Sequence, residues 1–124
     1  MGNDSTETLG KLQQSLVDIT VESWRFARLF ARALGKLDAG ESARYANQLR
    51  YYLKRLEESL ADAGLRLVNL EGQPYDTGMA ATALNIADFG PDDRLLVDHM
   101  VEPIIMNEAG LVKAGTIMVR KLEL

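Results

Sequence analysis

The chain has 124 residues, of which 47% are hydrophobic and 26% are charged, with no cysteine and a formal net charge of −4. This length predicts one domain or two small units, and the absence of cysteine excludes disulfides, thiolate metal sites and cysteine nucleophiles. No apolar run approaches the roughly 18 residues of a membrane span, and residues 1–11 lack the apolar core of an export signal, so we expect a cytoplasmic protein with no membrane partner.

Apolar residues near the start of the chain recur at alternating three- and four-residue steps, which is the heptad pattern of a packed helix. The positions in this seam are Leu9, Leu12, Leu16, Ile19, Phe26, Phe30, Ala33 and Leu37, with Ser23 as the one polar break. The spacing predicts a helix over residues 8–37. Val17, Val21 and Trp24 form a second apolar patch on another side of this helix.

A second helix is expected to follow at once. Asp38 stands three residues before Glu41, which is a capping-box variant and predicts a helix start near Ala39. Gly64 and Leu65 fit the C′ and C″ positions of a Schellman stop, which ends the helix there. The seam of this second helix comprises Tyr45, Leu49, Tyr52, Leu56 and Leu60. Residues 1–63 are therefore expected to form a helical hairpin.

The apolar stripes of this hairpin are wider than its two helices can cover for each other. We therefore expect two hairpins to pair into a dimeric four-helix bundle, so that the chain is a homodimer. The expected dimer interface consists of Leu12, Leu16, Ile19, Phe26, Phe30, Leu49, Tyr52 and Leu56.

After Gly64 the helical period gives way to short apolar segments separated by turns. The segments span residues 65–70, 83–87, 95–106 and 116–122, with a turn over 107–110. Pro103 cannot donate to a strand ladder, so we expect an edge or a bulge at its position. Residues 64–124 are predicted to form a small β domain, which makes the fold class α+β.

Charge is distributed unevenly between these two regions. Residues 1–63 hold nine Lys or Arg and nine Asp or Glu, whereas residues 64–124 hold five and nine. An acidic surface repels phosphate, so nucleic-acid binding by the second region is disfavoured.

A basic stripe on the first helix has two interpretations. Arg25, Arg28, Arg32 and Lys36 follow one another at steps of three, four and four residues. We interpret them as a solvated face whose charges pair with nearby acids, namely Asp18 and Glu22. The alternative is a docking stripe for an acidic partner.

No motif for nucleotide binding, metal binding or a serine nucleophile is present, so we expect no enzyme activity, catalytic residue, cofactor or metal. The one histidine, His99, follows Asp98, and neighbouring side chains on a strand face opposite ways, so the two are not expected to pair. Asp88, Asp92 and Asp93 are interpreted as a solvated turn rather than a calcium site. A small enzyme or ligand-binding domain that uses the Asp88–His99 region is a third alternative.

The order of these elements is similar to that of a known family. A bundle helix ends in Ala63-Gly64 and is followed by the run Gly72-Gln73-Pro74-Tyr75-Asp76. This arrangement resembles the opening of the C-terminal β domain in the GrpE family of nucleotide exchange factors. The closing run from Val112 to Lys121 is similar to the family's last strand. This resemblance covers residues 40–124.

The resemblance implies a co-chaperone that binds a DnaK-like or actin-like ATPase and promotes nucleotide release. The partner contacts that it implies are Tyr75, Val101, Lys113 and Val119. Three family positions, a histidine, a Gly-Tyr pair and an arginine, are replaced here at Ala80, Ile104-Ile105 and Gly110, which favours a dedicated ATPase over DnaK itself. The alternative is a dimeric adaptor that keeps the fold and has no exchange activity.

Overall fold

The computed structural model describes residues 2–123, with side chains for residues 4–123. Two long helices are followed by a small domain of short strands, so the fold is α+β as the sequence predicts. The chain groups into two compact units, Met1–Leu56 and Glu57–Leu124.

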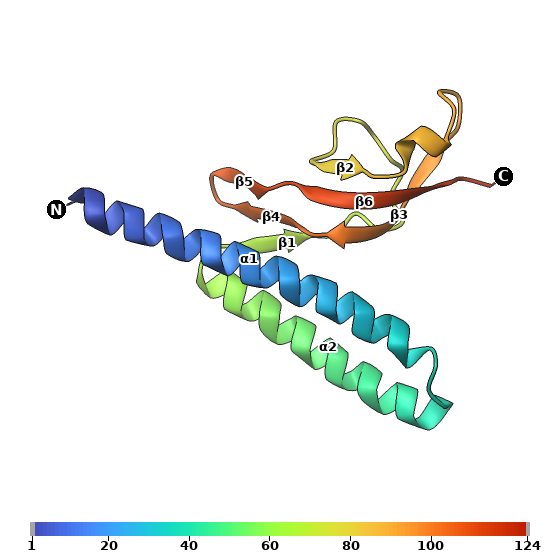
Figure 1. Cartoon of the computed structure of the whole chain (residues 1–124), viewed down its shortest axis with the longest axis horizontal. Helices are drawn as coiled ribbons and strands as arrows, with labels where there is room; N and C mark the ends of the chain where they lie inside the picture. Colours follow the sequence, from blue (N-terminus) through green and yellow to red (C-terminus); the bar gives the residue numbers. More distant parts are fainter. Residues whose placement is uncertain (1, 124) are drawn as a thin grey trace. The chain divides into compact units, whose positions relative to one another are not determined.

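The two helices are α1 (Gly2–Leu34) and α2 (Ala39–Asp62), which follow each other in an antiparallel hairpin (Figure 1). The expected start of α2 is confirmed, because Asp38 Oδ1 accepts a hydrogen bond of 2.9 Å from the Glu41 N–H. The expected bounds of α1 are wrong at both ends, since the helix begins at Gly2 rather than residue 8 and ends at Leu34 rather than Leu37. The N–H groups of Gly35, Lys36 and Leu37 each bond to the carbonyl three residues earlier, and this tighter winding replaces the α-helical pattern after Leu34.

The end of α2 has the geometry that its sequence predicts. The Leu65 N–H donates to the Leu60 carbonyl at 2.9 Å, and the Gly64 N–H donates to the Ala61 carbonyl at 2.9 Å. Gly64 has φ of 77°, the left-handed conformation that glycine adopts without a Cβ penalty. Leu60 and Leu65 are both buried, so the Schellman stop also anchors an apolar pair.

Six strands form two three-stranded sheets in the second unit (Figure 1). One sheet has the antiparallel order β1-β4-β5, and in the other, of order β2-β6-β3, β2 runs parallel to β6 while β3 runs antiparallel to it. The strands are β1 (Arg66–Val68), β2 (Ala81–Ala83), β3 (Leu95–Glu102), β4 (Ile104–Asn107), β5 (Gly110–Lys113) and β6 (Gly115–Lys121), with a short 3₁₀ helix η1 (Ile86–Asp88) after β2.

Two strand predictions need correction. The strand expected over residues 83–87 ends at Ala83, because Asn85 turns away to bond the backbone of β6 and residues 86–88 wind into η1. The segment expected over residues 95–106 is two strands from different sheets. Pro103 is buried at the junction between them, where the missing N–H interrupts no ladder.

The core of the second unit lies on the inward faces of β3, β4 and β6. Its fully buried side chains include Val97, Met100, Ile105 and Ile117. Gly115 is required in this core, since a Cβ there would lie 2.8 Å from the Glu102 carbonyl oxygen. The close approach fixes how β6 begins beside the end of β3.

Candidate functional site

Helix α1 carries two apolar stripes, and only one of them is buried within the chain. The buried stripe includes Val17, Val21 and Ala27, and therefore contains the patch that the sequence analysis placed beside the heptad seam. The heptad seam itself lies on the exposed side. Leu9, Leu12, Ile19, Phe26 and Leu29 are each more than half exposed, which leaves a row of large apolar side chains in solvent along α1.

None of the residues expected at a dimer interface is fully buried. Four of them are exposed, namely Leu12, Ile19, Phe26 and Tyr52. The other four are half-buried, namely Leu16, Phe30, Leu49 and Leu56. We name this set, together with Leu9 and Leu29, the apolar face of the hairpin.

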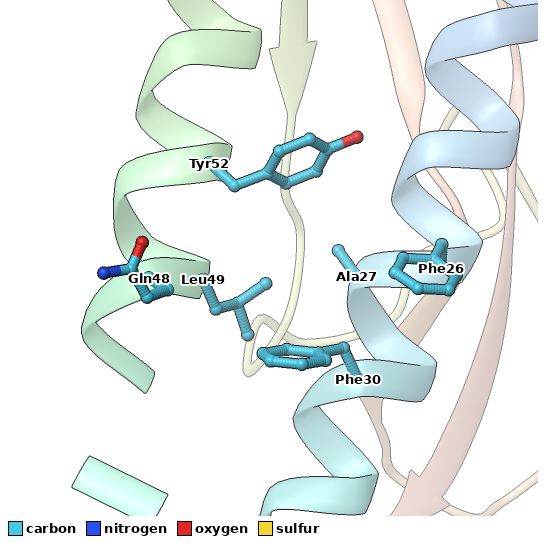
Figure 2. Close-up of a pocket in the computed structure, with 6 residues that line it drawn as sticks. All are labelled: Phe26, Ala27, Phe30, Gln48, Leu49 and Tyr52. Atoms are coloured by element: carbon cyan, nitrogen blue, oxygen red, sulfur yellow. The ribbon is translucent and has the colours of Figure 1, made fainter. Parts of the chain in front are cut away.

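A groove between α1 and α2 opens in the apolar face (Figure 2). It has a volume of about 380 Å³ and is lined by Phe26, Ala27, Phe30, Gln48, Leu49 and Tyr52. Figure 2 shows Leu49 and Tyr52 of α2 pointing toward α1, with Phe30 pointing back toward α2. The Phe30 ring also meets the Tyr45 ring edge to face, with centroids 6.3 Å apart.

A second hollow continues the groove along α1. It shares Phe26 and Tyr52 with the first and extends to Ile19, with Asp18 and Glu22 at its polar border. An aromatic or branched side chain gains roughly 1.5–3 kcal/mol when it is fully buried, so a partner that covered this continuous surface would gain substantially. The apolar face therefore has the shape and chemistry of a helix-packing interface.

Among the four residues that the resemblance implies as ATPase contacts, Tyr75 lies at a third hollow, in the β domain. It lines a hollow of about 470 Å³ in the β domain together with Ile86, Phe89 and Leu95. Val101, in β3, is half-buried and does not line this hollow. The β domain thus offers an aromatic-lined recess at Tyr75.

Lys113 and Val119 take part in contacts inside the β domain. The Lys113 Nζ lies 3.6 Å from Glu102 Oε1 and donates to the Ala114 carbonyl at 2.9 Å. Val119 is 3% exposed, and its backbone is bonded by the Asn85 side chain. The Lys113 side chain is thus partly exposed, whereas the Val119 side chain is buried and offers no contact at the surface.

Asp98 and His99 contact each other, so the expectation that they do not pair is wrong. His99 Nδ1 lies 3.0 Å from Asp98 Oδ2, because the register of β3 shifts between Val97 and His99 and the strict alternation of side chains is lost there. Arg120 Nε lies 3.4 Å from the other Asp98 oxygen. Asp98 thus contacts His99 through one carboxylate oxygen and Arg120 through the other.

Asp93 closes the turn that contains the neighbouring acids. Its carboxylate accepts a hydrogen bond of 2.8 Å from the Gly90 N–H and lies 3.4 Å from the Lys121 ammonium. The Gly90 N–H first, and the Lys121 charge second, hold the pKa of Asp93 below its usual value. Within residues 2–123, no group of three His, Asp or Glu side chains is placed to hold a metal ion.

No helix in the described part of the chain has the length and apolarity needed to cross a membrane. Comparison with known proteins finds no match, since no family model, no curated protein and no solved structure is significantly similar to this chain.

Proposed function

We propose that the chain is a dimeric, GrpE-like nucleotide exchange factor that binds a DnaK-like or actin-like ATPase through its β domain. The observation that carries this proposal is the exposed apolar face of the hairpin, placed in the chain directly before a small β domain. The motifs from Gly64 to Asp76 and from Val112 to Lys121 supply the family resemblance.

The apolar face supports dimerisation through self-complementary packing. Phe26 is 65% exposed and stands at the border of the groove, while the groove itself is lined by Phe30, Leu49 and Tyr52. In a two-fold dimer the same patch faces itself, so an apolar side chain of each copy packs into the groove of the other. The four helices then bury the heptad seam as the core of a bundle.

The β domain supplies the contact to the ATPase in this proposal. The recess at Tyr75 accepts an apolar side chain, and the Lys113 ammonium meets a carboxylate on the partner. No catalytic group is needed, because an exchange factor works by binding the open, nucleotide-free ATPase more tightly than the closed form. By reciprocal linkage, the bound exchange protein lowers the affinity of the ATPase for nucleotide by the same ratio as nucleotide lowers the affinity of the ATPase for the exchange protein.

The test is nucleotide release from the ATPase that co-purifies with the chain from its native cell. The ATPase is loaded with fluorescent ADP and chased with unlabelled ATP, at increasing concentrations of the chain. An exchange factor accelerates release and the rate saturates as the ATPase fills. An unrelated protein at equal concentration serves as the control.

The alternative is a dimeric adaptor with the same architecture and no exchange activity. The observation that favours it is the engagement of two implied contact residues within the β domain, Lys113 with Glu102 and Val119 in the core. An adaptor binds the ATPase and leaves the release rate unchanged, so the same experiment separates the two functions.

A further inference from the structure

The recess at Tyr75 is an open hollow of the β domain with a mainly apolar lining. Five of its eight lining residues have apolar or aromatic side chains, namely Tyr75, Ile86, Phe89, Pro91 and Leu95. Ile86 is 43% exposed, so a large aliphatic side chain meets solvent there. The volume of about 470 Å³ lies within the range of ligand-binding pockets, so the recess has room for a large side chain of a partner.

Four aspartates lie in the segments that form this recess, and we name them the acidic rim: Asp76, Asp88, Asp92 and Asp93. Asp93 itself lines the recess. Asp76 and Asp92 each stand between two lining residues, and Asp88 directly precedes another. Their Cα atoms therefore lie about 3.8 Å from those of lining residues, and all three side chains are exposed.

The charge of the acidic rim is neutralised at only one position. The Asp93 carboxylate lies 3.4 Å from the Lys121 ammonium. Asp76 accepts a hydrogen bond of 3.0 Å from the Gly78 N–H, which is neutral and leaves the charge in place. Asp76, Asp88 and Asp92 form no ion pair with any residue in the described part of the chain.

Arg94 stands between two lining residues, Asp93 and Leu95, but faces away from the recess. The Arg94 carbonyl accepts a hydrogen bond of 2.7 Å from the Leu122 N–H, so the ladder between β3 and β6 continues to this position. Successive side chains on an extended chain point to opposite sides. Because Asp93 and Leu95 line the recess, Arg94 lies on the other side and does not compensate the acidic rim.

We propose that the recess binds a segment of the partner that presents one large apolar side chain between Lys or Arg residues. This inference rests on the proposed function, since it assigns the segment to the ATPase. The apolar side chain fills the hollow, and the flanking cations meet the carboxylates of the acidic rim. An acidic segment is a poorer match, because like charges that face each other across an interface are unfavourable.

The test measures binding of a fluorescein-labelled peptide, Gly-Arg-Lys-Phe-Lys-Arg-Gly, to the full chain by fluorescence anisotropy. A second peptide has Ser in place of Phe, and a third has Glu in place of every Lys and Arg. We expect saturable binding of the first peptide and at least about tenfold weaker binding of the other two, since one loses the apolar side chain and the other the opposite charge.

Two matched variants locate the binding. Ile86→Ser/Asp92→Asn removes an apolar side chain of the recess and a carboxylate of the acidic rim. The control Leu111→Ser/Glu108→Gln removes an exposed aliphatic side chain and an exposed carboxylate that do not line the recess. The first variant is expected to bind the Phe peptide about tenfold more weakly, and the control as tightly as the wild type. Circular dichroism melting checks that both variants are folded.

Three results would overturn the proposal. Without saturable binding of the Phe peptide by the wild type, the recess is not a docking site. Equal binding of the Ser or the Glu peptide removes the role of the apolar side chain or of the acidic rim. Equal losses in both variants place the binding outside the recess.

Competition and nucleotide release separate this inference from the proposed function. The co-purified ATPase should displace the labelled peptide, and simultaneous binding of both would overturn the assignment of the segment to the ATPase. A chain that accelerates nucleotide release but does not bind the peptide keeps the proposed function and loses this inference. A chain whose bound peptide is displaced by the ATPase, without faster release, supports this inference in the adaptor alternative.

Discussion

Asn85 binds the backbone of Val119 at both of its polar groups. The Asn85 Nδ2 donates to the Val119 carbonyl at 2.8 Å, and the Val119 N–H donates to Asn85 Oδ1 at 2.9 Å. The amide side chain thus replaces a strand residue beside β6, just beyond the point where β2 ends at Ala83. It satisfies two buried backbone groups that β2 is too short to reach.

This arrangement predicts that Asn85→Ala destabilises the β domain by about 2–3 kcal/mol, because two backbone groups of the core strand lose their partner. The measurement is chemical denaturation followed by circular dichroism. Asn47→Ala is the matched control, since Asn47 is exposed on α2 and accepts a hydrogen bond only from Arg50. Its effect is expected to stay within about 0.5 kcal/mol. Equal losses for both variants would mean that the Asn85 contacts carry no stability.

Replacement by alanine at two glycines is expected to change the free energy of unfolding in opposite directions. Gly64 has a positive φ, so Gly64→Ala places a Cβ in the left-handed region and is expected to destabilise by roughly 1–2 kcal/mol. Gly10 lies inside α1, where an added Cβ meets nothing within 4 Å, so Gly10→Ala is expected to stabilise by roughly 0.5–1 kcal/mol. Thermal melting checks both signs. A neutral Gly64→Ala would refute the strain argument at the end of α2.

The sequence predicts the hairpin well because its signals are local. The capping aspartate Asp38 and the terminating pair Gly64-Leu65 act within one helical turn, and the structure has both. The sequence predicts the β domain less well, because its strands are short and are ended by distant partners. The hydrogen bonds between the Asn85 side chain and the Val119 backbone join residues 34 positions apart, and no local sequence pattern predicts them.

The site on α1 shows a second limit of pattern reading. Periodicity marks both the seam through Phe26 and the patch through Val17 and Val21 as apolar, but it does not tell which is covered by the chain's own residues. The structure buries Val17 and Val21 and exposes Phe26. The heptad with the longer run is therefore the one that the chain's own residues leave exposed.

Dimerisation through the apolar face predicts that aspartate substitutions at two equally exposed aromatic residues differ sharply in their effect on the dimer. Phe26 and Tyr51 are 65% and 63% exposed in the single chain, so aspartate at either position costs the monomer little. In the proposed dimer only position 26 becomes buried, and an unpaired charge there costs several kcal/mol. Phe26→Asp is therefore expected to weaken the dimer by about 100-fold or more, while Tyr51→Asp leaves it intact.

Sedimentation equilibrium at micromolar concentration is the measurement, with circular dichroism to confirm that helix content is retained. A wild-type chain that sediments as a monomer would refute dimerisation. Dissociation by both variants would place the interface elsewhere on the hairpin.

The role of Lys113 in partner binding is separable from its role in the β domain. Its side chain is 28% exposed and pairs with Glu102, so Lys113→Met and Glu102→Gln both remove the same ion pair. Loss of the ion pair costs each variant up to about 1 kcal/mol. Glu102 also accepts a hydrogen bond of 3.3 Å from Thr116 Oγ1, so the stability of both variants is measured beside their binding. Only Lys113→Met removes the ammonium that, in the proposed function, meets a carboxylate of the ATPase.

We therefore expect Lys113→Met to bind the co-purified ATPase at least about tenfold more weakly, because a charge-assisted hydrogen bond contributes about 1.5–3 kcal/mol and 1.4 kcal/mol corresponds to one decade. Glu102→Gln keeps the ammonium, which still donates to the Ala114 carbonyl, and should bind as tightly as the wild type. Titration calorimetry without nucleotide and with ATP gives both affinities.

An exchange factor must bind more weakly with ATP present, since factor and nucleotide favour opposite states of the cleft. Equal affinity in both conditions would refute exchange and leave the adaptor function standing, whatever the result for Lys113.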